Sequence, residues 1–347
     1  MKVEELRKLA DVLPESGKII LCTHRHPDPD GLGAIVGLQF LLKRRFGLEV
    51  DLVLEGRIRR AENVAMRDLL QIHSIPKGSV DPAAYKGIIL VDSQPGFSHT
   101  NPPGALPVLA VFDHHDGPKG EAAHLGDVPF VWVAPDYGAT STMIYDLLAA
   151  FGLEPDTRSA TALYCGVRYD TNNLLRGATQ RDEDAFRVLE RLADRQVVGA
   201  IDQPPLPKQY FRQMHIALEA CEDYQTLLLT LLGEVSSPES VAEIADWFLR
   251  LEGQQWSLCG GACDGRYQVS LRTDLADADA YPALRFLLGR EGKCGGHGRM
   301  AGGQIPLTEL TVEQVQDLIR TRAIELFGLE GRQAERLAEP QDVDKTR

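Results

Sequence analysis

The chain has 347 residues, of which 44% are hydrophobic and 25% are charged, and its formal net charge at pH 7 is −13. This balance is typical of a globular protein, and the length predicts about two domains. The excess of acidic residues argues against a broad surface for long nucleic acid, which needs many cationic side chains. A small phosphorylated substrate remains compatible with it, because metal ions can supply positive charge locally.

The sequence shows neither a membrane segment nor a secretion signal. No apolar run reaches the length of a membrane-spanning helix, and the N-terminus carries acids where a signal peptide needs basic and then apolar residues. The six cysteines include no pair spaced as CxxC, which favours buried thiols in a reducing compartment over a zinc site. We therefore expect a cytoplasmic protein that does not bind membranes.

Short apolar runs alternate with helical patterns in the first half of the chain. The predicted strands are residues 18–23, 50–54, 87–91, 107–112 and 130–133. The predicted helices are residues 31–46, 61–70, 137–151, 157–167 and 181–195. This alternation predicts an α/β domain over residues 1–195, with a parallel sheet and helices on both of its faces.

The alternation of strand and helix patterns ends near residue 200, where a proline cluster at 202–207 cannot continue a helix. We predict a linker over residues 196–222, with a helix at 211–221, and a smaller α/β domain over residues 223–330. In that domain the predicted strands are 226–232, 256–260 and 267–271, and the predicted helices are 238–251, 280–288 and 311–327. Residues 331–347 are charged without a periodic apolar face, so we expect a disordered tail.

Polar clusters follow three predicted strands of the first domain. They consist of carboxylates and imidazoles: His24, Asp28, Asp30, Asp92, Asp113, His114 and His115. A single aspartate at a strand end is usually a turn or cap residue, so the prediction depends on the three clusters together. Because ligands bind at the carboxyl ends of strands in open α/β sheets, we expect the clusters to converge on one edge of the sheet.

This composition indicates a metal centre. Carboxylates and imidazoles without a thiolate are typical ligands of hard or borderline ions such as Mn²⁺ and Mg²⁺. Crowded carboxylates would repel one another unless cations lay between them, and two-metal sites recur in phosphoryl hydrolysis. Pro27 and Pro29 stiffen the first cluster, and Gly31 and Gly33 allow a tight start of the next helix, whose N-terminus favours anions.

A glycine-rich stretch at residues 294–303 is the second notable feature. It lies among four cations: Arg285, Arg290, Lys293 and Arg299. Glycines let backbone N–H groups approach an anion closely. In a strongly acidic chain this local basic stretch predicts a phosphate-binding element, and the alternative is a loop that merely needs turns.

These motifs resemble those of the DHH phosphoesterases with a DHHA1 domain, over roughly residues 18–305. The four motifs of that family are matched in order by His24-Arg-His-Pro-Asp28-Pro-Asp30, Asp92, Asp113-His114-His115 and Asp170. Asp170 is singled out mainly by this resemblance, because its local pattern is weak. The glycine signature of the second domain is similar to Gly295-Gly296-His297, and Arg272 lies on a strand like the one that accompanies it.

The resemblance implies two divalent cations, with Mn²⁺ favoured over Mg²⁺, and an active site in the cleft between the domains. The implied metal ligands are His24, Asp28, Asp30, Asp92, His114 and Asp170, with Asp92 as the bridge. It also implies that His115 contacts the phosphate or protonates the leaving oxygen, and that Asp113 orients an imidazole. The implied substrate-binding residues are Arg272, Gly295, Gly296 and His297.

From this resemblance we expect a nanoRNase-like exonuclease. It would release 5′-terminal nucleotides from oligoribonucleotides of a few residues and act on adenosine 3′,5′-bisphosphate. One alternative is a phosphodiesterase for cyclic di-AMP or linear dinucleotides, and another is a catalytically silent nucleotide-binding sensor. The expected partner is a short oligoribonucleotide or nucleotide rather than a long duplex, and the resemblance suggests a homodimer.

Overall fold

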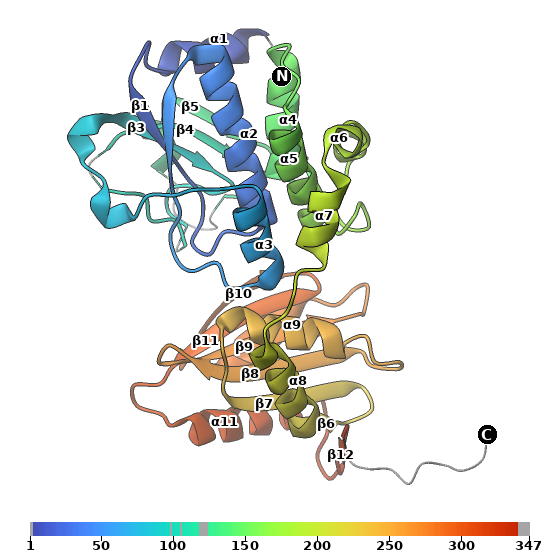
Figure 1. Cartoon of the computed structure of the whole chain (residues 1–347). Helices are drawn as coiled ribbons and strands as arrows, with labels where there is room; N and C mark the ends of the chain where they lie inside the picture. The colour runs from blue at the N-terminus through green and yellow to red at the C-terminus, as the bar shows by residue number, and fades with distance from the viewer. Residues whose placement is uncertain (1–2, 98, 105, 118–123, 339–347) are drawn as a thin grey trace. The chain divides into compact units, whose positions relative to one another are not determined.

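The computed structural model describes residues 3–97, 99–104, 106–117 and 124–338 (Figure 1). The chain divides into two compact units, Met1–Pro205 and Leu206–Arg347. Each unit has a sheet and an apolar core of its own. Within the described ranges, no helix combines the length and apolar character that a membrane span requires.

The first unit is built on a five-stranded parallel sheet in the order β2-β1-β3-β4-β5. Its strands are β1 (Lys18–Cys22), β2 (Glu49–Val53), β3 (Tyr85–Val91), β4 (Val108–Asp113) and β5 (Phe130–Val133). Its α-helices are α1 (Val3–Val12), α2 (Pro29–Phe46), α3 (Ala61–Leu69), α4 (Thr140–Ala150), α5 (Thr157–Asp170), α6 (Gln180–Leu192) and α7 (Arg195–Asp202). The predicted α/β class with a parallel sheet is confirmed.

The two faces of this sheet are covered differently. Strand residues such as Ile19 and Leu21 pack with helical side chains in one large core. The alternate residues Ile20 and Cys22 pack instead with loop residues such as Ile75, and no described α-helical residue belongs to that second cluster. The expectation of helices on both faces is therefore wrong. Figure 1 shows the labelled helices of this unit, α1 to α7, on one side of its sheet.

Helix α2 positions the first predicted motif. Asp28 is its N-cap, and Oδ1 of Asp28 accepts hydrogen bonds of 3.0 Å from the backbone N–H groups of Asp30 and Gly31. Pro29 lies in the first turn, where the N–H that it lacks is not needed. The first ten residues of α2 are buried, which fixes its N-terminus relative to the sheet.

The second unit has a seven-stranded mixed sheet in the order β10-β11-β9-β8-β7-β6-β12, in which β7 and β8 are parallel. Its strands are β6 (Cys221–Asp223), β7 (Leu227–Glu234), β8 (Trp256–Cys263), β9 (Arg266–Thr273), β10 (Lys293–His297), β11 (Met300–Pro306) and β12 (Glu335–Arg336). Its helices are α8 (Lys208–Ala220), α9 (Pro238–Phe248), α10 (Ala280–Leu288) and α11 (Val312–Leu326). Residues of α8 and α9 pack in one core, and residues of α10 and α11 in another.

Two segments of the second unit differ from the expectations. The glycine-rich stretch is an antiparallel hairpin of β10 and β11 at the sheet edge, which the sequence pattern did not predict. Residues 331–338, expected to be disordered, include β12, which pairs with β6. Backbone pairing with a distant strand, together with packing of Ala334 and Leu337 against the two apolar cores, explains that local order. Residues 339–347 lie outside the described ranges.

Candidate metal centre

The predicted ligands converge at the carboxyl edge of the first sheet. They come from the segments after β1, β3 and β4, from the start of α2 and from the end of α5. Their donor atoms form three overlapping groups, each within 4.8 Å: His24, Asp28 and Asp92; Asp30, His114 and Asp170; and Asp92, His114 and His115. The structure thus brings together six residues that the sequence motifs singled out as ligands.

Asp92 lies between the two imidazoles of the cluster. Its Oδ2 is 3.5 Å from Nε2 of His24, and its Oδ1 is 3.8 Å from Nε2 of His114. The Thr140 hydroxyl donates a 2.9 Å hydrogen bond to Oδ1. Asp92 is 2% exposed and has a φ of 56°, a left-handed conformation that is uncommon outside glycine. This central position fits a carboxylate that two cations share.

Asp30 is held by the N-terminus of α4. Its Oδ2 accepts a 2.6 Å hydrogen bond from the backbone N–H of Thr140, and its Oδ1 accepts one of 2.8 Å from that of Ser141. These N–H groups have no partner within the helix, and the helix dipole favours a negative charge there. Burial, together with Asp92 and Asp170, nevertheless raises the pKa of Asp30 well above its ordinary value.

His114 presents one ring nitrogen to the carboxylates. Its Nδ1 is 3.2 Å from the carbonyl oxygen of Tyr137, to which a proton on Nδ1 donates, leaving Nε2 free to act as a ligand. Nε2 is 3.0 Å from Oδ2 of Asp170 and 4.0 Å from Oδ2 of Asp30. This buried nitrogen has no hydrogen-bond partner of normal geometry among the described residues. A buried ring nitrogen that faces several carboxylates fits a bound cation.

The pKa values of the clustered side chains also favour bound cations. Burial lowers the pKa of His24, but Asp28 and Asp92 outweigh it and raise that pKa well above the ordinary range. Burial also opposes protonation of His114, but Asp170 and Asp30 raise its pKa to about 11. Burial and neighbouring carboxylates raise the pKa of Asp170 to about 6. The excess negative charge therefore retains protons that cations would replace.

Asp113 and His115 form a hydrogen-bonded pair beside the cluster. Nδ1 of the exposed His115 lies 2.8 Å from Oδ1 of Asp113, which is fully buried. Gln94 donates a 2.8 Å hydrogen bond to Oδ2 of Asp113 and one of 2.9 Å to the backbone oxygen of His115. The Asp113 carboxylate is thus oriented by Gln94 on one side and His115 on the other. Nε2 of His115 takes no part in this pair and can contact another group.

A glycine lets α2 approach the cluster. A Cβ atom added to Gly31 would lie 2.7 Å from the Thr23 hydroxyl, 3.2 Å from Oδ2 of Asp92 and 3.3 Å from Nε2 of His24. The sequence pattern assigned Gly31 to a tight helix start. The structure adds that no larger side chain fits beside these two ligands.

Sequence reasoning missed the residues that hold the ligands. Asp182 is fully buried and accepts four hydrogen bonds, from the N–H of Gly138, the hydroxyl of Thr142, and the N–H and hydroxyl of Thr179. It thereby anchors the segment 137–142, which contacts three predicted ligands through Tyr137, Thr140 and Ser141. The Thr179-x-x-Asp182 spacing of a helix capping box is the local signal that could have marked Asp182, but it does not predict the contacts with Gly138 and Thr142.

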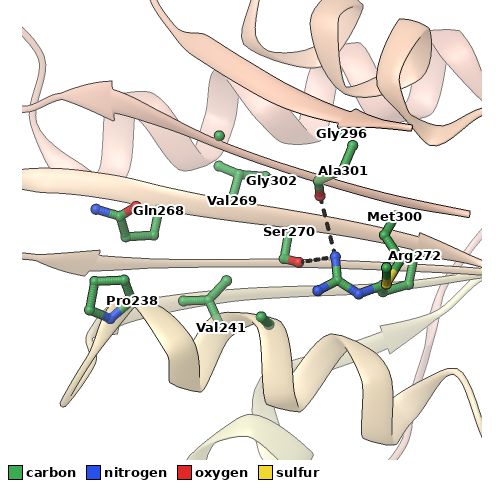
Figure 2. A pocket seen from close by; sticks show the side chains of 12 residues that line it. Pro238, Val241, Gln268, Val269, Ser270, Arg272, Gly296, Met300, Ala301 and Gly302 are labelled. Atoms are coloured by element: carbon green, nitrogen blue, oxygen red, sulfur yellow. Dashed lines mark hydrogen bonds between the residues drawn. The ribbon is translucent and has the colours of Figure 1, made fainter. Parts of the chain in front are cut away.

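The second unit contains the other predicted substrate residues. Arg272 and Gly296 line a pocket of about 330 Å³ between α9 and the strands β9 and β11 (Figure 2). Gly295 lies nearby on β10, opposite Gly302. The backbone of His297 ends β10, and its side chain lies outside what the structure describes. Nε of Arg272 donates to Asp246 of α9, and Nη1 donates to the Ser270 hydroxyl at 2.6 Å.

Comparisons with known proteins agree with this architecture. Residues 18–167 match the DHH family, N-terminal domain. The chain is 26% identical to an uncharacterized protein of Methanocaldococcus jannaschii over 324 residues, 90% of this chain and 64% of that protein. It is 22% identical to a cyclic-di-AMP phosphodiesterase of Listeria monocytogenes over 336 residues, 89% of this chain and 47% of that protein. The chain thus spans less than two thirds of the length of either relative.

A solved structure shows the same fold. The crystal structure of an exopolyphosphatase-related protein from Bacteroides fragilis matches with a TM-score of 0.75 and 15% identity, covering 95% of this chain and 99% of that one. The family match spans β1 to α5, the segment that carries the converging motifs. Residues 18–167 therefore form an N-terminal domain of the DHH family, and the second unit is consistent with a DHHA1-like region.

Proposed function

We propose that the chain is a two-metal phosphoesterase. The observation that carries this proposal is the overlap of the three donor groups, which share Asp92 and His114. His24, Asp28 and Asp92 would hold one cation. Asp30, Asp92, His114 and Asp170 would hold the other, which we propose to be Mn²⁺ in preference to Mg²⁺. Two such ions supply charge that neutralises the phosphate and favours hydroxide over water at neutral pH.

The residues of the chain have distinct roles in this proposal. Asp113 accepts a hydrogen bond from the Nδ1–H group of His115 and fixes the orientation of its ring. Nε2 of His115 can then donate a proton to the leaving oxygen as the ester bond breaks. Thr140 and Ser141 orient Asp30 and Asp92 by hydrogen bonds, so these two carboxylates need not reorganise during the reaction.

We propose short oligoribonucleotides as substrates, cleaved to release the 5′-terminal nucleotide, and adenosine 3′,5′-bisphosphate as a further substrate. The net charge of −13 supports short substrates, since binding of a long strand needs many cationic contacts. The pocket beside Arg272 supports a nucleotide-sized ligand, because small-molecule sites typically occupy roughly 300–1,000 Å³.

A cyclic-di-AMP or linear dinucleotide phosphodiesterase is the second candidate. The observation that favours it is the similarity to the phosphodiesterase of Listeria monocytogenes, which extends over 89% of this chain. Both candidates place the same chemistry at the metal centre and differ only in which phosphodiester is bound.

Turnover of a substrate panel tests these proposals. Diribonucleotides, trinucleotides, cyclic di-AMP and adenosine 3′,5′-bisphosphate are assayed with Mn²⁺ and with Mg²⁺. We expect Asp92→Asn to lower turnover at least about 100-fold. Asp11→Asn on the exposed face of α1 is the matched control and should retain activity. If the wild type hydrolyses none of these esters with either ion, the chain is better described as a silent nucleotide-binding sensor.

A further inference from the structure

Three side chains of β9 share the face that borders α9. Gln268, Ser270 and Arg272 are two residues apart along the strand, so they project to the same side. All three line the pocket, together with Pro238 and Val241 of α9 (Figure 2). In the figure Gln268 lies toward the Pro238 end, Ser270 in the middle and Arg272 at the opposite end.

The middle of this face has almost no side-chain atoms, because two of its residues are glycines. Ser270 lies opposite Gly302 of β11, and Gly302 lies opposite Gly295 of β10. A Cβ atom on either glycine would meet no atom within 4 Å. With strands spaced about 4.8 Å apart, the two glycines and the small side chain of Ser270 form a floor roughly 10 Å wide, enough for a planar two-ring heterocycle.

Folding does not explain glycine at position 302. Its neighbour Gly303 projects to the opposite face, where an added Cβ would lie 2.4 Å from Leu288 and 2.7 Å from the backbone oxygen of Lys293. Gly303 is therefore needed for packing. Gly302 is exposed, has open space beside it and lies in a regular strand, where glycine is unfavourable. A ligand that lies against the strand would explain why position 302 has no side chain.

Polar groups stand at both ends of the floor. The amides of Gln268 and of Gln304, which lies opposite Gln268, are half-buried without a hydrogen bond to the described residues. At the other end, Nε and Nη1 of Arg272 already donate hydrogen bonds. Nη2 has no such bond within the described ranges and can donate to an anion. At about 3.3 Å per residue, roughly 13 Å of strand separates Gln268 from Arg272.

We propose that this glycine-floored face binds the purine base of the nucleotide substrate, with Gln268 reading the edge of the base. An amide matches the donor and acceptor pattern of adenine, which glutamine can contact in bidentate fashion. The Val241 side chain forms the apolar wall of the site, and Arg272 binds the phosphate of the same nucleotide. This inference rests on the nucleotide substrate of the proposed function and adds the element that selects its base.

Calorimetric binding to the full chain with Mn²⁺ tests this site. The probes are AMP, CMP and ribose 5-phosphate, which all carry the same phosphate, so that differences in affinity report on the base. We expect the wild type to bind AMP about tenfold more tightly than ribose 5-phosphate, and more tightly than CMP. Gly302→Val, which has space for its side chain, should bind AMP no better than ribose 5-phosphate. Gln268→Leu should lose the preference for AMP over CMP.

Gly233→Val is the matched control, because Gly233 is an exposed glycine of β7 with nothing within 4 Å of an added Cβ. It should keep the wild-type preferences. The inference is overturned if the wild type binds AMP and ribose 5-phosphate equally, or if Gly302→Val retains the preference for AMP. Turnover of the substrate panel distinguishes the two proposals. A chain that turns over dinucleotides without base-dependent binding refutes this inference alone, and base-dependent binding without turnover refutes the proposed function alone.

Discussion

Removing the Asp182 carboxylate should weaken the metal centre without touching any predicted ligand. Asp182→Ala leaves three donors without an acceptor: the buried hydroxyl of Thr142 and the half-buried N–H groups of Gly138 and Thr179. At roughly 1–1.5 kcal/mol each, the free energy of unfolding should fall by about 3–5 kcal/mol. The segment 137–142 also loses its anchor. Because loss of a group that orients metal ligands typically costs 10–100-fold in affinity, we expect roughly that loss for Mn²⁺.

Asp182→Asn separates the two effects. Its carbonyl oxygen can replace the carboxylate oxygen that accepts from Gly138 and Thr179, and its NH₂ group can donate to the Thr142 hydroxyl. Mn²⁺ titration calorimetry and urea unfolding of the metal-free proteins provide the two readouts. We expect near-normal Mn²⁺ affinity for Asp182→Asn. If Asp182→Ala is destabilised but binds Mn²⁺ as tightly as the wild type, Asp182 supports the fold only and the positioning argument fails.

Three further predictions concern the ligands and their surroundings. Gly31→Ala should lower Mn²⁺ affinity about tenfold or more, because the added methyl meets the Thr23 hydroxyl at 2.7 Å; calorimetry with unchanged affinity would contradict it. The pKa of Asp170, about 6, lies above that of an unfolded aspartate, so the metal-free protein loses stability as pH rises through about 6. The gain in melting temperature from Mn²⁺ should therefore grow between about pH 5 and 7, and a constant gain would count against the proton retention described for His114 and Asp170. His115→Ala should lower turnover of dinucleotides by about 100-fold or more but that of a p-nitrophenyl ester much less, since p-nitrophenolate needs no proton to leave; equal losses would exclude the acid role.

The sequence alone predicted where the residues of the candidate metal centre meet. His24, Asp92 and His114 each follow a strand, and parallel strands present their carboxyl ends at one sheet edge. The prediction needed only the strand pattern and the residue types, both of which are local properties. The alternation of strands and helices in the first unit was predictable for the same reason.

Tertiary structure decided what supports the centre. Ser141 contacts Asp30 across 111 residues of sequence, and Asp182 contacts Gly138 across 44. No local pattern encodes such contacts, because they depend on how helices dock. The coverage of the sheet faces was also mispredicted, since the rule for parallel sheets says nothing of the loops around Ile75 that cover the second face.

In the glycine-rich stretch, too, the sequence predicted the residue chemistry and the folded structure decided the side-chain directions. Its composition identified it as a place where a ligand could approach the backbone closely. Only the pairing of β11 with β9 revealed that Gly302 faces open space beside Ser270 while Gly303 faces the core. The face to which a strand residue points is set by its partners in the sheet, and a single-residue shift in register would exchange the two glycines. Residue chemistry is therefore readable from the sequence, whereas the direction of each side chain depends on the folded neighbours.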